Sequence, residues 1–266
     1  MQPWAGILNC ENDILVQSRQ FGDVIWQKTA SHVLRSIVPS PPLLARAGNI
    51  CIAVRVLMRD PWHMAEPCII EYFYSAHSAY AYLGAWELER IAQVTGWRVE
   101  HRPIDLLPVI QAASGDAFGS CSDAHSAYFF GRDMFRWAQL RGLPMIRHRP
   151  TYHDNPLALP NGMIMAAGED AGPLSRAILQ AHWRDDANIA DPATLAVLAE
   201  EVGLDGAALL DRADSPAIQA QHRRNTDEAI ARNIFGSPTY FLRGDMFYGQ
   251  DRLQMLEQAI ANPFAP

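Results

Sequence analysis

The chain has 266 residues, of which 49% are hydrophobic and 19% charged, a balance typical of a globular protein. Its formal charge of -7 and its pI near 5.7 argue against a nucleic-acid-binding protein, which needs a basic surface to neutralise phosphates. No apolar run reaches the roughly 18 residues of a membrane-spanning helix. We therefore expect a soluble enzyme with neither a nucleic-acid nor a membrane partner.

The cysteines argue against a dithiol redox centre and against a zinc knuckle. Cys10, Cys51, Cys68 and Cys121 are far apart and form no C-x-x-C pair, which both kinds of site require. A disulfide between distant cysteines is one possibility, and free thiols in a reducing cytoplasm are the simpler interpretation. Free thiols would place the protein in the cytoplasm. The histidines have no metal-ligand spacing, so we also predict that there is no metal site. The only lysine is Lys28, which excludes a Schiff-base lysine from any functional domain that begins after it.

The first 63 residues differ from the rest of the chain. They carry six basic and four acidic residues, whereas residues 64–266 carry 16 basic and 25 acidic ones. Their apolar residues keep no sustained period, and they match neither a secretory signal nor an organelle transit peptide. We predict that residues 1–63 are a poorly ordered extension, or a stretch translated before a natural start at Met64. One functional domain over residues 64–266 would follow.

The pattern becomes regular after Cys68. Residues 68–74 are apolar and rich in β-formers, which predicts a buried strand. A helical pattern over 79–94 follows and ends at Gly96, and residues 97–102 alternate as in a second strand. Strand, helix and strand at this spacing predict a βαβ unit with two parallel strands.

Helices follow, and the chain then returns to β structure. Helices are predicted over 123–140, from Asn161 as N-cap to a break near Gly172-Pro173, from Asp191-Pro192, and over 216–231. Strands 238–242 and 246–248 flank the turn Arg243-Gly-Asp245, and a helix over 250–261 closes the chain. The order predicts an α/β fold of the thioredoxin-like βαβ…ββα plan, with an all-helical domain inserted at about residues 110–230.

Ser78 stands at the turn where a thioredoxin-like fold places its nucleophile, because the following helix N-terminus stabilises an anion. A serine hydroxyl cannot shuttle electrons, but it can donate a hydrogen bond to a bound thiolate. Alternatively, Ser78 only caps the helix. Its neighbour His77 is a candidate general acid or base, with a bystander role as the alternative.

Two later segments are candidate binding elements. In Phe235-Gly-Ser-Pro-Thr239, a cis bond at Pro238 would turn the Ser237 backbone toward a peptide-like ligand. The commoner alternative is a proline that only begins a strand. Near Gln250 and Asp251, helix N-terminal amides and a carboxylate can bind a zwitterionic group, although a capping aspartate would show the same pattern.

Taken together, these stretches resemble the 2-hydroxychromene-2-carboxylate isomerases and the related kappa-class glutathione transferases of the DsbA-like thioredoxin superfamily. The resemblance extends in order from residue 68 to about 261, and the first 63 residues have no counterpart. The matching stretches are Ser78-Ala-Tyr-Ala-Tyr-Leu83, Pro103-Ile-Asp-Leu106, Arg136-Trp-Ala-Gln-Leu140 with Gly142-Leu-Pro144, Phe235-Gly-Ser-Pro-Thr239 and Gly249-Gln-Asp-Arg-Leu253.

This resemblance implies glutathione as cofactor and a small aromatic substrate. Ser78 would hydrogen-bond the glutathione sulfur, Ser237 before a cis Pro238 would pair with the cysteinyl backbone, and Gln250 and Asp251 would hold the γ-glutamyl end. The implied reaction is cis–trans isomerisation of 2-hydroxychromene-2-carboxylate or a related conjugated acid. It would proceed by transient thiolate addition and elimination in a homodimer.

Other functions stay open. A kappa-class transferase would consume glutathione by conjugating it to electrophiles, and a non-enzymatic thioredoxin-like protein would only bind a ligand. A thiol–disulfide oxidoreductase is disfavoured by the lack of C-x-x-C. The sequence also departs from the family: Ala79 replaces a frequent proline, residues 119–122 lack a common asparagine, and Gln250 replaces a shorter side chain. The exact substrate therefore stays open.

Overall fold

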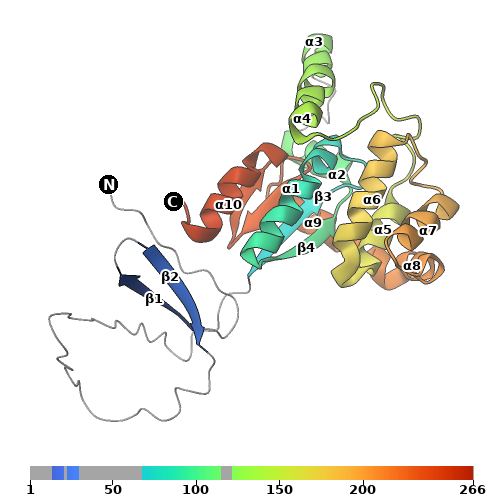
Figure 1. The fold of residues 1–266 in the computed structure, drawn as a ribbon. Coiled ribbons are helices and arrows are strands. Elements are labelled where there is room, and N and C mark those ends of the chain that lie inside the picture. Colours follow the sequence, from blue (N-terminus) through green and yellow to red (C-terminus); the bar gives the residue numbers. More distant parts are fainter. Residues whose placement is uncertain (1–13, 21–22, 30–67, 115–121, 266) are drawn as a thin grey trace, which may run out of the picture. The chain divides into compact units, whose positions relative to one another are not determined.

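The computed structural model describes residues 14–20, 23–29, 68–114 and 122–265, which belong to two separate compact units. The first unit, Met1–Pro67, contains an antiparallel hairpin of β1 (Ile14–Gln20) and β2 (Asp23–Thr29) (Figure 1). The sequence analysis did not predict this hairpin, and the remainder of the predicted 1–63 extension lies outside the described residues. In the described part of the chain, no helix combines the length and apolarity needed to cross a membrane.

The second unit, Cys68–Pro266, is built on a four-stranded sheet with the order β4-β3-β5-β6. Its strands are β3 (Ile69–Tyr74), β4 (Arg98–Pro103), β5 (Thr239–Leu242) and β6 (Asp245–Tyr248), with α1 (Ala79–Thr95) between the first two. β3 and β4 are parallel, whereas β5 is antiparallel to both β3 and β6. Phe73 pairs with Thr239, so the end of β3 lies beside the start of β5. The predicted βαβ and ββα halves are both confirmed.

Helices fill the segment between β4 and β5, which we call the insertion (residues 106–231). The later ones, from residue 158 to residue 213, form a group beside the sheet, whereas α1 and α10 lie next to one another against it (Figure 1). The helices of the insertion are α2 (Leu106–Ser114), α3 (Asp123–Ser126), a π-helical turn η2 (Ala127–Asp133), α4 (Met134–Arg141), α5 (Ala158–Ala166), a 3₁₀ turn η3 (Gly168–Asp170), α6 (Ala171–Arg184), α7 (Pro192–Glu201), α8 (Gly206–Ala213) and α9 (Pro216–Ala231). The chain closes with a 3₁₀ turn η4 (Gln250–Arg252) and α10 (Leu253–Ala261).

The alternation of strand side chains divides the core into two layers. Tyr72, Tyr74 and Tyr240 are fully buried in the larger layer, which also contains residues of α1, α6 and α10. Their rings stack, with centroids 3.9 Å apart for Tyr72 and Tyr74 and 5.1 Å apart for Tyr72 and Tyr240. On the other face, Phe73 and Phe241 pack with α2 and α9. Helices therefore cover both faces of the sheet and fix the ends of β3 and β5.

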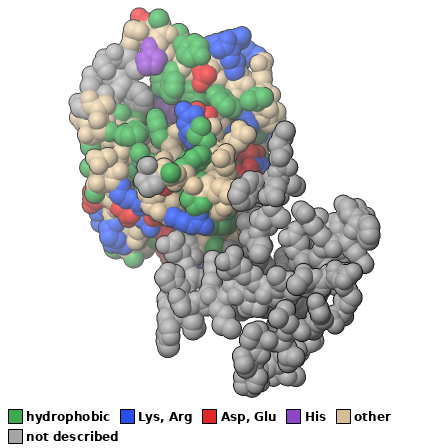
Figure 2. Space-filling view, turned by 90° about the vertical axis from the view of Figure 1, so that its left-hand side faces the viewer, with side chains coloured by type: hydrophobic (Ala, Val, Ile, Leu, Met, Phe, Trp, Pro, Cys, Tyr) green, Lys and Arg blue, Asp and Glu red, His purple; other side chains and the backbone are tan. Residues whose placement is uncertain are grey.

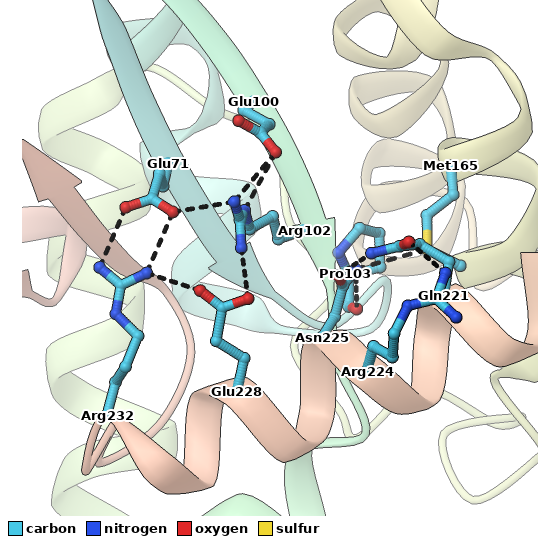
Figure 3. A network of polar contacts seen from close by, with 10 residues as sticks. All are labelled: Glu71, Glu100, Arg102, Pro103, Met165, Gln221, Arg224, Asn225, Glu228 and Arg232. Atoms are coloured by element: carbon cyan, nitrogen blue, oxygen red, sulfur yellow. Dashed lines mark hydrogen bonds and ion pairs between the residues drawn. The ribbon is translucent and has the colours of Figure 1, made fainter. Parts of the chain in front are cut away.

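An ion-pair network joins the sheet to the end of α9 (Figure 3). Arg232 bonds both Glu71 (3.0 Å) and Glu228 (2.9 Å), and Arg102 bonds the same two carboxylates at 3.0 and 2.6 Å. The Arg232 guanidinium also lies 3.6 Å from the centroid of the Phe241 ring. Two arginines shared between two carboxylates hold α9 in register with β3 and β4.

The start and the break of the helices after residue 157 were predicted wrongly. α5 begins at Ala158, so Asn161 is a helical residue and not the N-cap. The chain interrupts its helices at Gly168, which has φ +61°, whereas Gly172-Pro173 lies in the first turn of α6. A proline is tolerated there because N–H groups of the first turn have no intrahelical acceptor.

Cys68 is disulfide-bonded. For Cys68, the structure therefore confirms the alternative of a disulfide between distant cysteines, and the prediction of a free thiol is wrong. Cys10, Cys51 and Cys121 lie outside the described residues.

Candidate active site

Ser78 is the N-cap of α1. Its backbone is extended (φ -71°, ψ 121°), and its side chain accepts a hydrogen bond from Ala81 N at 3.3 Å. The prediction that Ser78 caps the helix is therefore confirmed, since this bond gives a partner to one of the free amides of the first turn. The same hydroxyl also donates to the carbonyl of Ser237 at 3.2 Å. Ser78 thus joins α1 to the segment before β5.

The Ser237–Pro238 peptide bond is cis. Ser75 N donates to the Ser237 hydroxyl at 3.1 Å, and Gly249 N donates to the Pro238 carbonyl at 2.9 Å. The end of β3, the start of α1, the start of β5 and the end of β6 therefore meet here. The structure brings together Ser78, Ser237 and Pro238, which the sequence analysis had proposed from separate motifs.

Backbone N–H groups beside the Ser78 hydroxyl have no hydrogen-bond partner among the described residues. Ala79 N and Tyr80 N are in the first turn of α1, and neither donates a hydrogen bond to any described residue; the same is true of Ser237 N. Such a set of amides at a helix N-terminus favours an anion through both hydrogen bonds and the helix dipole. The arrangement suits a bound thiolate or carboxylate next to a peptide-like backbone.

Gln250 and Asp251 are adjacent in sequence but have different surroundings. Gln250 is only 1% exposed, and its side-chain oxygen accepts from Arg141 at 3.0 Å. The Asp251 carboxylate is exposed and lies 3.3 Å from Arg252. A ligand can reach Asp251 directly, whereas the Gln250 side chain packs inside the molecule. The geometry therefore gives Gln250 a structural contact and leaves Asp251 as the accessible group of the pair.

Tyr80, in the first turn of α1, connects the site to the π-helical turn. Its hydroxyl contacts the Phe129 carbonyl at 2.9 Å and the Asp133 carboxylate at 3.0 Å. Burial, this hydrogen bond and the charges of Asp133, Tyr248 and Asp251 raise the pKa of Tyr80. π-helical turns often occur at functional sites, and this one brings an acceptor and a carboxylate to the edge of the candidate site.

The insertion holds the loop that precedes α1. Asn161, fully buried in α5, accepts a hydrogen bond from Ala76 N at 3.1 Å. Trp183 in α6 donates from its indole nitrogen to the His77 carbonyl at 2.9 Å. The sequence analysis missed both roles, having predicted Asn161 as a cap and Trp183 as a packing residue. These contacts join residues 85 and 106 positions apart, so no local pattern could have shown them.

His77 belongs to a cluster of three imidazoles. It shares a hydrogen bond with the Ser75 hydroxyl at 2.8 Å, and its ring centroid lies 4.6 Å from that of His153, which in turn bonds His182 at 2.9 Å. Burial, with the neighbouring His153 and His182, lowers the pKa of His77 to about 3. His77 is therefore a neutral imidazole near pH 7. No group of His, Cys, Asp or Glu among the described residues is arranged to hold a metal ion.

Large hydrophobic side chains remain exposed, and Phe235 and Tyr248 are two of them, 50% and 42% exposed. Figure 2 shows hydrophobic side chains among charged ones on one face of the molecule. Phe235 and Tyr248 lie in the segments that flank Ser237 and Pro238, and their rings form an edge-to-face pair with centroids 5.6 Å apart. The sequence analysis assigned no role to either ring.

Comparison with solved structures supports the fold. The chain superposes on a 2-hydroxychromene-2-carboxylate isomerase with a TM-score of 0.63 and 27% identity, covering 72% of this chain and 94% of that one. It also resembles a probable DsbA oxidoreductase from Streptomyces coelicolor, with a TM-score of 0.58 and 18% identity over 74% of this chain and 92% of that one. The second likeness concerns the fold alone.

Sequence comparison agrees. A 2-hydroxychromene-2-carboxylate isomerase of Pseudomonas sp. (strain C18) is 28% identical over 193 residues, which cover 72% of this chain and 90% of the relative. A protein of the same name from Sphingobium xenophagum is 29% identical over 199 residues, covering 71% and 95%. The resemblance predicted from the motifs is thereby confirmed. Residues 69–261 match the DSBA-like thioredoxin domain, and the chain belongs to that family.

Proposed function

We propose that this chain is a glutathione-dependent isomerase that acts on 2-hydroxychromene-2-carboxylate or a related conjugated aromatic acid. One observation carries the proposal. In a DSBA-like domain, a serine hydroxyl at the N-terminus of α1 bonds the carbonyl of the residue before the cis proline. A serine in this place supports thiol binding without disulfide exchange, and sequence relatives with the isomerase name support the reaction class.

The residues fit a tripeptide thiol. Ser237 N donates to none of the described residues, so it is available to a peptide-like backbone, and the exposed Asp251 carboxylate is available to an ammonium group. Ser78, Ser237 and Asp251 would hold glutathione, and the Gln250 side chain would support the site from inside. When bound, glutathione supplies a thiol whose reversible addition to a conjugated double bond allows rotation about that bond.

Ser78 has a single hydroxyl proton, and this limits what it can bind at one time. In the structure this proton is directed to the Ser237 carbonyl. If the hydroxyl rotates toward a bound sulfur, it donates there, and the Ser237 carbonyl becomes free to accept an N–H from the ligand backbone. The Ala79 and Tyr80 amides and the α1 dipole favour the anionic form of that sulfur. One side chain therefore exchanges an internal hydrogen bond for two ligand contacts.

The test compares two N-cap serines. Ser78→Ala and Ser215→Ala each remove a serine that accepts from a first-turn amide, but Ser215 caps α9 and has no other assigned role. Both variants should lose about 1 kcal/mol of stability. Only Ser78→Ala should also lower glutathione-dependent isomerisation, by about 100-fold, as expected for loss of a donor to a reacting anion.

Calorimetric titration with reduced glutathione should show saturable binding by the wild type and weaker binding by Ser78→Ala. A mass balance of glutathione separates an isomerase, which regenerates the thiol, from a transferase, which consumes it. The proposal fails if the wild type does not bind glutathione at millimolar concentration, or if both serine variants retain full turnover.

A further inference from the structure

Tyr248 is the last residue of β6 and stands directly opposite Thr239, the first residue of β5. Tyr248 is 42% exposed, and its ring packs edge-to-face on that of Phe235, which is 50% exposed. An exposed pair of aromatic rings offers an apolar surface that a flat ring of a ligand can cover. Phe235 lies two residues before Ser237 in the sequence, and Tyr248 pairs with Thr239, the residue after Pro238. The two rings therefore lie on either side of the Ser237–Pro238 segment of the candidate site.

The Tyr248 hydroxyl lies against the backbone of Gly236. A Cβ placed on Gly236 would be 3.2 Å from the hydroxyl oxygen, so the missing side chain allows this close approach. The hydroxyl makes no hydrogen bond with any described residue, although Ser237 follows Gly236 directly. It is therefore a polar group beside the site with an available donor and acceptor.

The charge around this hydroxyl keeps its proton in place. Burial and the carboxylate of Asp251 raise the pKa of Tyr248. The hydroxyl is therefore a donor throughout the neutral pH range. Tyr248 and Asp251 also help to raise the pKa of Tyr80, so these three groups lie within electrostatic range of one another at the start of α1.

We propose that Tyr248 is a substrate-binding residue of this site. Its ring, together with Phe235, packs on the flat ring of the conjugated aromatic acid, and its hydroxyl donates a hydrogen bond to an oxygen of that substrate. The inference rests on the proposed function, because it names the position of the substrate in the same site. Aromatic pairs of this kind contribute beyond the burial of area alone, which suits a planar substrate.

The experiment uses Tyr248→Phe and Tyr248→Ala, with Tyr152→Phe and Tyr152→Ala as matched controls. Tyr152 is 41% exposed and lies in the loop between α4 and α5, in a different segment from β5 and β6. We expect Tyr248→Ala to raise the KM for the aromatic acid about tenfold and Tyr248→Phe about threefold, from the loss of ring and hydroxyl contacts respectively. Neither should change the Kd of glutathione by more than about twofold, and the Tyr152 variants should match the wild type.

A binding measurement makes the outcome independent of turnover. The probe is 2-hydroxycinnamate, a conjugated aromatic acid with a phenolic oxygen, titrated by its fluorescence. Probe binding that weakens in Tyr248→Ala, but not in Tyr152→Ala, supports the inference. If this occurs in a protein without glutathione-dependent isomerisation, the proposed function fails while the aromatic-acid site stands.

The inference is overturned if the wild type does not bind the probe, or if Tyr248→Ala binds it as tightly as the wild type does. It is also overturned if the KM of an active Tyr248→Ala variant is unchanged. Thermal unfolding of each variant confirms folding, and the isosteric Tyr248→Phe keeps the hydroxyl contribution testable if the alanine variant is unstable.

Discussion

At the scale of single residues, Asn161 shows how one buried amide can fix the loop before α1, at the candidate active site. Its side-chain oxygen accepts from Ala76 N, while its nitrogen donates to the Ile104 carbonyl at 3.3 Å and to His222 at 3.1 Å. All the groups it bonds are main-chain or imidazole atoms in different elements. Removing it would leave several of them buried without a partner, which costs more than the bonds themselves contribute.

We therefore expect Asn161→Ala to lower the free energy of unfolding by about 2–4 kcal/mol. Urea unfolding measures this loss, and faster hydrogen exchange at the Ala76 amide would locate it at the loop. Asn155→Ala is the control, because the half-buried side-chain amide of Asn155 bonds one side chain among the described residues, that of Asn188. Equal losses in the two variants, or unchanged exchange at Ala76, would contradict the role given to Asn161.

His77 gives a prediction about pH. Since its pKa is about 3, the imidazole stays neutral between pH 6 and 8 and has no proton to donate as a general acid. The pH–rate profile of His77→Gln should therefore keep the shape of the wild-type profile in this range. Steady-state rates of both proteins from pH 5.5 to 8.5 provide the check. Loss of a wild-type inflection near pH 6.5 in the variant would show that His77 titrates during turnover.

The sequence predicted the local structure of candidate residues where a motif fixes the backbone, and it failed where the partner of a side chain is remote. Ser78 could be found because a cap has a position relative to its helix, and Pro238 because few residues allow a cis bond. Asn161 has the residue type of a cap but uses its side chain over a long range. Gln250 was predicted from its place at a helix start and from the family resemblance, neither of which tells whether a side chain points inward or outward.

At the scale of elements, the strands and α1 could be predicted from the spacing of apolar residues and from the residues that end each element. The alternation around Tyr72, Phe73 and Tyr74 assigns their side chains to opposite faces, and Gly96 ends α1 in the left-handed conformation with φ +70°. The start of α6 was not predicted because Gly172-Pro173 also reads as a helix breaker. Whether Gly172-Pro173 breaks a helix or lies in its first turn depends on where the preceding residues place the start of α6.

The ion-pair network gives a prediction for α9. Glu71 accepts from both Arg102 and Arg232, so Glu71→Gln removes one charge from two partners at once. We expect a loss of about 1–2 kcal/mol that shrinks in high salt, because these pairs are only partly buried. Thermal unfolding without denaturant, at low and at high salt, measures this loss of stability. Glu257→Gln, which removes an exposed partner of Arg90, should cost under about 1 kcal/mol, and an equal effect would argue against the network.

At the scale of the whole molecule, the histidines predict sensitivity to acid. Burial is the main cause that lowers the pKa of five of them, namely His77, His101, His153, His182 and His222, and the first four fall to about 3 or 4. The unfolded chain binds these protons near pH 6.5, whereas the folded protein does not. Stability is therefore complete above pH 6.5 and falls as the pH drops toward 4.

Each proton taken up only by the unfolded chain makes the free energy of unfolding fall by about 1.4 kcal/mol per pH unit. Melting temperatures at half-unit steps from pH 7.5 to 4.5 should show this decline. His101→Gln should flatten the slope by about one proton, because the partly buried His101 lies beside Tyr74 and stays neutral in the folded protein. A melting temperature that is level down to pH 5 would contradict the buried, neutral state of these side chains.

The separation along the chain of the Ser78 hydroxyl from its acceptor carbonyl has a consequence for biosynthesis. The donor and the acceptor are 159 positions apart, and the insertion that grips the loop is made between them. During translation the helix that presents Ser78 emerges long before the segment with Ser237. A nascent or prematurely terminated chain therefore has the Ser78 hydroxyl without the Ser237–Pro238 segment that faces it. Under the proposed function, a chain that ends before Ser237 has only part of the glutathione site, so unfinished chains in the cell would not compete for glutathione.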